Sequence, residues 1–330
     1  MARLSKQDKA AYDRYLRTLL EAPHIRGQHA GKCYPAQSDG ILDMVRSHFE
    51  HGVGAPPEAC ATNDNGDPLP GLVVPHLDFR VGGPVYSYGY RELLSSEPAD
   101  LYVILGVGHR CPADVSVSRK GYTTVLGDVA CDQRFVADLA AGVPFPIEVE
   151  PLSHNDEHSI EFAVIYLQAI AAMFPRYAGF SIVPVLCGGM HQEIMRGSAA
   201  GSAFGEFATA LGDAIGSCGK KVCIIGSIDG SHVGPRFQHP FAVDERLRRR
   251  IELLDRSTFD MVSRGEPEAF FSGFLETFNA QGFDGVGVLY IMLLLFGGRA
   301  VFELLHYDQW YEHEDRSMVT LASGVFRPAG

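Results

Sequence analysis

Short apolar runs that alternate with longer amphipathic stretches constrain the fold of this chain more than any other feature. Each run is rich in β-branched residues, which is typical of strands buried on both faces of a parallel or mixed sheet. The alternation therefore predicts an α/β protein with helices on both faces of a central sheet. The predicted strands cover residues 72–74, 101–105, 182–186 and 222–225, and the helices between them cover 85–94, 159–173, 203–215 and 242–262.

The rest of the chain extends this pattern into one domain. Amphipathic helices are predicted over residues 5–20 and 37–51, and residues 52–71 are dense in Gly, Pro, Asn and Asp and read as a loop. Further strands are predicted over 123–126, 301–305 and 318–326. We therefore expect an N-terminal helix within residues 1–25 and a single α/β domain over residues 26–330.

Composition and charge exclude several functional classes. The 330 residues are 46% hydrophobic and 21% charged, which suits a large buried core. The formal net charge of −12 argues against nucleic acid and anionic membranes as partners. The longest apolar run, residues 286–296, is too short to span a bilayer and fits a buried helix better. Seven cysteines without a CxxC pair indicate free thiols in a reduced, cytoplasmic protein.

Three of the predicted strands are followed by a histidine after a turn. These are His76 in LVVPH, His109 in VILGVGH, and His232 in CIIGSIDGSH, where Asp229 comes just before it. The carboxyl ends of parallel strands meet at one edge of a sheet, where ligands bind. Imidazole ligates metals and moves protons near neutral pH. A shared metal or catalytic site is one interpretation, and separate structural histidines are the other.

The segment HNDEHSIEF, residues 154–162, is a loop that runs into a predicted helix. His154 and His158 are four residues apart, a spacing that places two side chains on one face of a helix. The alternative is that Asp156 caps the helix and both histidines are solvated. The chain contains no P-loop, HExxH, GxSxG or GxGxxG motif, so nucleotide binding and serine hydrolysis lack support.

Several segments together resemble the Memo family, also called AmmeMemoRadiSam system protein B. They are, in order, AGKCYPA, VVPHLDFRVGGPVYSYGY, ILGVGHRCP, DEHSIEF, IVPVL, SIDGSHVGPRF, GVGVL and SMVTLASGVF. The resemblance spans about residues 26–327, and DEHSIE is its most specific part. It implies a fold like that of the class III extradiol dioxygenases of the LigB type. Those enzymes hold Fe(II) with two histidines and a carboxylate, whereas Memo proteins have a cysteine in place of the carboxylate.

The resemblance also implies roles for individual residues. His76 and His109 take the positions of the two histidine ligands, and Arg110 stands where the family often has a further histidine. His232 takes the acid/base position with Asp229 beside it. The EHSIE motif contributes His158 and Glu161 as further catalytic candidates.

The third metal ligand departs from the family pattern. The cysteine position falls on Gln281 within NAQGFDGVGVL, and an amide is a poor ligand for a borderline metal. Asp284, three residues later, restores a carboxylate only if the local backbone differs from that of the family. His232 is another residue that could complete the metal site.

The leading hypothesis is a metal-dependent, dioxygenase-like oxidoreductase with Fe(II) as the first choice of metal and Cu or Zn as alternatives. His232 would move a proton on a phenolic or similar small substrate, and Asp229 or Glu161 would orient a histidine. The alternative is a non-enzymatic module that binds a peptide or small anion in the same cleft. A metal-dependent hydrolase is a weaker option, and oligomerisation is left open. The arginines that could pair with an anion are Arg80, Arg110 and Arg236.

Overall fold

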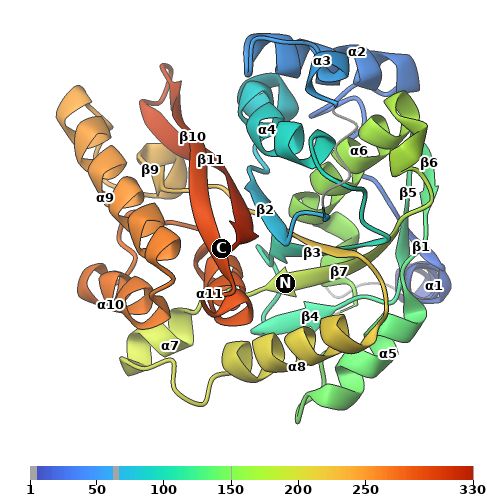
Figure 1. Ribbon diagram of the computed structural model, residues 1–330. Helices are drawn as coiled ribbons and strands as arrows, with labels where there is room; N and C mark the ends of the chain where they lie inside the picture. The colour runs from blue at the N-terminus through green and yellow to red at the C-terminus, as the bar shows by residue number, and fades with distance from the viewer. Residues whose placement is uncertain (1–5, 62–66, 150, 330) are drawn as a thin grey trace.

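The computed structural model describes residues 6–61, 67–149 and 151–329, and shows a mixed α/β fold (Figure 1). Its main sheet has eight strands, of which seven lie in the order β10-β11-β2-β8-β3-β7-β4, while β9 pairs with β11. The four central strands are parallel, and β10, β11 and β4 run antiparallel to their neighbours. The central strands are β2 (Gly71–Val74), β8 (Val222–Ser227), β3 (Leu101–Val107) and β7 (Ser181–Cys187).

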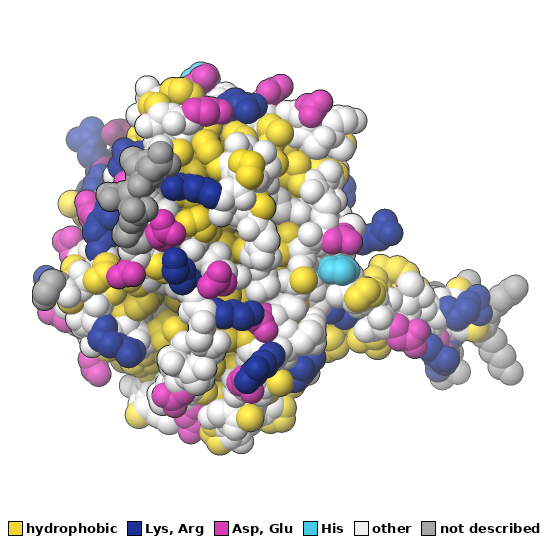
Figure 2. All heavy atoms as spheres, turned by 45° about the vertical axis from the view of Figure 1, so that its right-hand side comes forward, with side chains coloured by type: hydrophobic (Ala, Val, Ile, Leu, Met, Phe, Trp, Pro, Cys, Tyr) yellow, Lys and Arg dark blue, Asp and Glu magenta, His cyan; other side chains and the backbone are white. Residues whose placement is uncertain are grey.

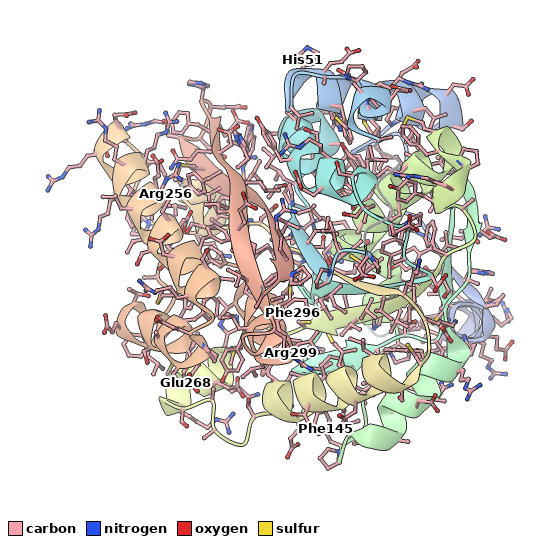
Figure 3. The ribbon with its side chains drawn as sticks, viewed as in Figure 1. His51, Phe145, Arg256, Glu268, Phe296 and Arg299 are labelled. Atoms are coloured by element: carbon pink, nitrogen blue, oxygen red, sulfur yellow. The ribbon has the colours of Figure 1, made fainter. Side chains whose placement is uncertain are left out.

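Helices cover both faces of this sheet, and each face has its own apolar core. One face carries α2 (Ser38–His51), α4 (Phe79–Leu94) and α6 (His158–Met173). The other carries α5 (Gln133–Gly142), α8 (Ala203–Ser217) and α11 (Val286–Phe296). Side chains fill the space between these layers, as Phe296 does by packing its ring 4.4 Å from that of Phe326 (Figure 3).

The remaining elements lie around this framework. The longest strands form the hairpin of β10 (Ala300–Glu312) and β11 (Ser317–Pro328), and α9 (Glu245–Arg264) packs on β10. A second, three-stranded sheet has the order β1-β5-β6. The other described elements are β1 (His24–Arg26), α3 (Pro57–Cys60), β4 (Val115–Val117), β5 (Gly121–Thr124), β6 (Gly127–Val129), η1 (Ser153–Asp156), η2 (Pro175–Tyr177), α7 (His191–Arg196), β9 (His232–Val233), η3 (Pro235–Phe237) and α10 (Pro267–Thr277).

The predicted α/β class is confirmed, with differences at the ends of elements. Helix α4 begins at Phe79, well before the predicted start at residue 85, because Asp78 caps it by accepting a hydrogen bond from the amide of Arg80. The sequence Gly82-Gly83-Pro84 does not predict a helix at this turn, because glycine and proline are poor helix formers. The predicted strand 301–305 is the first part of the much longer β10.

The N-terminal helix α1 (Lys6–Glu21) projects from the body of the protein (Figure 2). Residues 1–5 of the predicted N-terminal segment, residues 62–66 of the predicted loop and residue 330 lie outside the described residues. In the part of the chain that the structure describes, no helix is long and apolar enough to cross a membrane. None of the seven cysteines, which all lie in the described residues, forms a disulfide.

The register of the central strands determines where their ends meet. Ser227 of β8 lies opposite Val74 of β2 and opposite Gly106 of β3. Strand β8 therefore separates the two strands that carry the first two strand-end histidines. Because all three strands are parallel, the turns that follow them emerge at the same edge of the sheet.

Candidate metal centre

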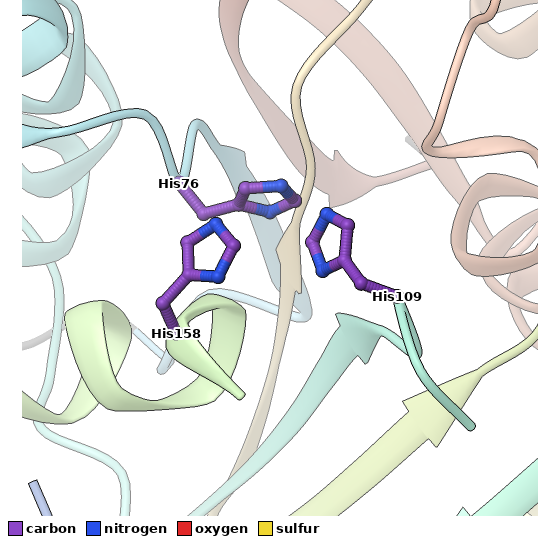
Figure 4. Close-up of side chains that lie close together, drawn as sticks. All are labelled: His76, His109 and His158. Atoms are coloured by element: carbon purple, nitrogen blue, oxygen red, sulfur yellow. The ribbon is translucent and has the colours of Figure 1, made fainter. Parts of the chain in front are cut away.

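His76 and His109 follow β2 and β3, and the protein holds each ring through Nδ1. Nδ1 of His76 donates to the carbonyl of Ser227 at 3.0 Å, because a carbonyl can only accept. Nδ1 of His109 lies 2.9 Å from Oε1 of Glu157. Both rings therefore turn Nε2, and not Nδ1, toward the centre. Their centroids are 5.1 Å apart, and the rings converge in Figure 4.

Asp284, in the loop before α11, brings a carboxylate between these two histidines. Its Oδ2 lies 3.0 Å from Nε2 of His76 and 3.8 Å from Nε2 of His109. Its Oδ1 accepts a hydrogen bond from the amide of Asp229 at 3.0 Å, which fixes the carboxylate. Nε2 of His76 and Oδ2 of Asp284 are both buried and have no hydrogen-bond partner other than each other, so they form an ion pair when the ring is protonated. Two such atoms facing each other fit a shared cation.

His158, the first residue of α6, adds a third imidazole to the cluster. Its ring stacks on that of His109 at 4.7 Å and 21°, and its centroid lies 5.1 Å from that of His76 (Figure 4). Ligand atoms of the three histidines lie within 4.8 Å of one another. Glu157 positions His109 and also caps α6 by accepting from the amide of Ser159.

Asp229 is a second carboxylate in contact with His76. Its Oδ1 accepts the amides of His76 and Leu77 at 2.9 and 3.1 Å, so it fixes the backbone that carries the first histidine. Its Oδ2 is 3.8 Å from Nε2 of His76, and His76, Asp229 and Asp284 form a second group that could hold a metal ion. From the sequence we expected Asp229 to accept the ring N–H of a histidine, whereas in the structure it accepts hydrogen bonds from backbone amides.

The charges around the centre favour a bound cation. Burial lowers the pKa of His109, but the neighbouring carboxylates of Asp284 and Glu157 outweigh burial and raise it to about 10. Burial also lowers the pKa of His76, but the nearby carboxylates of Asp229 and Asp284 outweigh burial and raise it. Burial raises the pKa of Asp284, yet the two histidines hold it well below its ordinary value. A site that binds protons this strongly on two imidazoles is electrostatically suited to a divalent ion at the same nitrogens.

His158 behaves differently from its neighbours. Burial and the positive charges of His76 and His109 lower its pKa to about 3, although Glu157 acts in the opposite direction. His158 is therefore a neutral imidazole in contact with two cationic ones.

The structure places His232 at the start of β9, outside both groups of potential ligands found among the described residues. Its Nδ1 lies 3.1 Å from the carbonyl of Gly230, and its ring packs edge-on against Phe237 at 4.9 Å. Gln281 is buried, and its backbone carbonyl accepts from the amide of His232 at 3.0 Å. Of the three residues considered from the sequence as third ligand (Gln281, Asp284 and His232), Asp284 is the one whose side chain meets the two histidines.

Glu161 lies one helical turn after His158 on the same side of α6, but its carboxylate bonds the N-terminal loop and not the strand-end histidines. It accepts from the ring and the amide of His29, from the amide of Gln28 and from the hydroxyl of Tyr34. It therefore orients a histidine, as expected from the sequence, but the histidine is His29 and not one of the strand-end residues.

The three predicted anion-binding arginines are each paired with an acidic side chain. Arg80 is exposed and binds Asp78. Arg110 is exposed and binds Asp156. Arg236 binds Asp315 at 2.9 Å and lies over the ring of Trp310; its second acidic partner is Glu312. His154 of the HNDEHSIEF segment is buried apart from the cluster, with Nε2 3.1 Å from the hydroxyl of Ser116.

Sequence reasoning missed two side chains and one backbone group that shape this site: Glu157, His29 and the carbonyl of Ser227. Glu157 stands next to His158 in the DEHSIE segment, and its position just before a helix indicated a cap and not a partner for His109. His29 lies in the glycine- and histidine-rich loop after the first helix, where no local pattern distinguishes it. Backbone carbonyls leave no signal in the sequence.

Fold and site together define an α/β protein with a cluster of histidines and a carboxylate at the carboxyl ends of its parallel strands. The model of the family described as Memo, Memo-like protein, matches residues 26–325, and this chain belongs to that family.

Relatives with the same family name come from archaea and bacteria. A MEMO1 family protein of Methanopyrus kandleri is 30% identical over 69% of this chain and 75% of its own length. One of Aquifex aeolicus is 26% identical over 93% of this chain and 74% of its own. One of Thermococcus kodakarensis is 26% identical over 90% and 97%, respectively. Among solved structures, an uncharacterised Escherichia coli protein aligns with 13% identity and a TM-score of 0.38, over 77% of this chain and 99% of its own.

Proposed function

We propose that this Memo-like protein binds a divalent metal ion through His76, His109 and Asp284 and acts as a dioxygenase-like oxidoreductase. The observation that carries the proposal is the convergence of three ligand atoms: Oδ2 of Asp284 lies 3.0 Å from Nε2 of His76 and 3.8 Å from Nε2 of His109. Nε2 of His76 and Oδ2 of Asp284 are buried with no partner but each other, and a cation between them, a proton or a metal ion, satisfies both.

The donor set favours Fe(II) over the alternatives Cu and Zn. Two imidazoles and one carboxylate with open positions are characteristic of non-haem Fe(II) oxygenases. When bound, such an ion supplies positions for a substrate oxygen and for O₂. Asp284 offers a hard oxygen donor where the family resemblance led us to expect a soft thiolate, and this difference disfavours Cu(I).

The chain's own residues would orient the ligands and the substrate. Glu157 and the carbonyl of Ser227 hold His109 and His76 with Nε2 toward the centre, which is how partners of ligating histidines tune a metal site. His158 stays neutral, so it can accept a hydrogen bond from a ligand hydroxyl. His232 as acid/base remains a prediction, with a ring whose Nδ1 is held by a backbone carbonyl.

The other candidate functions have less support. A module that binds a peptide or small anion needs free cations, and Arg80, Arg110 and Arg236 are each engaged by an acidic residue. A metal-dependent hydrolase would use the same centre but has no feature of its own. A phenolic or similar small substrate, a cytoplasmic location and an oligomeric state remain predictions from the sequence.

The direct test is metal analysis after anaerobic loading with Fe(II), followed by gel filtration. We expect the wild-type protein to retain close to one iron per chain and the His76→Ala/His109→Ala double variant to retain almost none. His51→Ala is the matched control, because His51 is an exposed histidine at the end of α2 (Figure 3). Equal, negligible iron in wild type and double variant would refute the proposal.

A further inference from the structure

The loop between β1 and α2 is anchored on one buried carboxylate, that of Glu161. Oε2 accepts the amide of Gln28 at 2.9 Å and Nδ1 of His29 at 2.8 Å, and Oε1 accepts the amide of His29 at 3.0 Å and the hydroxyl of Tyr34. These four donors satisfy the buried carboxylate and hold the loop against α6. They fix the ring of His29 as firmly as Glu157 fixes that of His109.

His29 extends the row of imidazoles that begins at the candidate metal centre. The ring of His158 lies 4.7 Å from that of His109 on one side and 5.7 Å from that of His29 on the other. The buried ring of Phe162 contacts both, 5.6 Å from the ring of His29 and 5.4 Å from that of His158. The row runs across the mouth of the site, from β3 over the start of α6 to the N-terminal loop.

Exposure shows the side from which a ligand can approach. The side chains of His76 and Asp284 are 1% and 14% exposed, whereas those of His109 and His158 are 35% and 33% exposed, and that of His29 is 18% exposed. The metal-binding atoms thus lie at the bottom, and the accessible surface above them consists of histidine rings. A ligand that approaches the centre from its exposed side therefore meets this row of rings.

We propose that His29 is a substrate-positioning residue of this site and that it binds an anionic group at the end of the ligand remote from the metal. The inference rests on the proposed function, since it assumes a ligand whose other end is held by the metal. The ligand class that fits is a small molecule with two functional groups. A pair of oxygens at one end binds the metal, and a carboxylate or similar acceptor at the other end reaches past the ring of His158 to His29.

The chemistry of the His29–Glu161 pair supports an anionic partner. Nδ1 is engaged by Glu161, and in the described residues Nε2 on the opposite edge of the ring has no hydrogen-bond partner. The hydrogen bond with Glu161 raises the pKa of His29, although burial acts in the opposite direction. A ring that carries both protons donates one to Glu161 and offers the other to a ligand, and such charge-assisted bonds are the strong ones.

The experiment measures the affinity of Co(II)-loaded protein for hydroxamates through the visible absorption of the metal. Acetohydroxamate probes the metal end alone. The monohydroxamates of succinic, glutaric, adipic and suberic acid add a carboxylate at increasing reach. We expect one member of the series to bind the wild type at least about tenfold more tightly than acetohydroxamate does, as a hydrogen bond between charged groups provides.

The variants separate the possible outcomes. His29→Ala should remove the advantage of the carboxylate arm and leave the affinity for acetohydroxamate unchanged, and Glu161→Gln should reduce that advantage; His51→Ala should behave like wild type. An advantage that survives in His29→Ala overturns the inference, as does a wild type that shows none, while either result leaves the metal centre standing. A wild type that takes up no Co(II) overturns the proposed function and this inference with it.

Discussion

The partner of His109 offers the sharpest test of how the centre is built, through the substitution Glu157→Gln. Oε1 of Glu157 accepts from Nδ1 of His109 at 2.9 Å and from the amide of Ser159 at 3.0 Å, while Oε2 accepts from the amide of His109 at 3.2 Å. Glutamine keeps the length of the side chain and one acceptor oxygen. It loses the negative charge that makes His109 a stronger ligand.

The magnitude follows from two observations. Removing a partner that orients a metal-ligating histidine typically costs about 10- to 100-fold in metal affinity, or roughly 1.4–2.7 kcal/mol. Burial opposes ionisation of Glu157, but the hydrogen bond with His109 lowers its pKa from 4.5 to about 2. That shift corresponds to at most about 3 kcal/mol of folding stability, present at neutral pH and lost as the pH falls from about 4.5 to about 2.

The assay is a competitive titration of Co(II) or Fe(II) against a chelator, with thermal melting of the metal-free protein measured alongside. We expect weaker metal binding by one to two orders of magnitude and a metal-free protein less stable by about 1–3 kcal/mol. Asp156→Asn is the matched control, because this neighbouring acid is exposed and pairs with Arg110, and its loss should change stability by less than about 0.5 kcal/mol. Wild-type metal affinity in Glu157→Gln, at any melting temperature, would refute the assignment of His109 as a ligand.

Three further substitutions test other parts of the argument. Asp284→Asn should weaken metal binding by more than about 100-fold, beyond the effect of partners that only orient a ligand, and should also destabilise the metal-free protein, because it removes the carboxylate paired with the buried His76. Retained affinity in the chelator titration would exclude its carboxylate as a ligand. Gly287→Ala should destabilise the protein by about 1–3 kcal/mol in urea unfolding, because a Cβ at this position would overlap the carbonyl of Gly188. At Gly205 a Cβ would meet open space, so Gly205→Ala should be neutral or stabilising. Similar unfolding curves for the two variants would contradict the close approach of Gly287 to Gly188. Burial lowers the pKa of His48 to about 4, so this residue should cost the wild type about 3 kcal/mol of stability as the pH falls from about 6.5 to about 4. His48→Phe should lose correspondingly less stability over the same range. Equal dependence of the unfolding free energy on pH in the two proteins would show that this histidine does not titrate as argued.

The elements of this protein could be predicted from local pattern because each core strand is a continuous apolar run and each helix has its own periodicity. Residues 286–296 were predicted to be a buried helix, and α11 has the same bounds. The strand-end positions of His76 and His109 followed in the same way, since a turn after a parallel strand must emerge at one edge of the sheet.

The composition of the site depended on contacts that no local pattern records. The sequence left Gln281 and Asp284 as alternative third ligands. Only the packing of the loop before α11 against the segment that follows β8 brings the carboxylate of Asp284 to His76. Glu157 and His29 reach the histidine row from segments far from β2 in the chain. The physical reason is that hydrophobic periodicity specifies which face of an element is buried, whereas the partner of a polar side chain is determined by which elements become neighbours when the chain closes on itself.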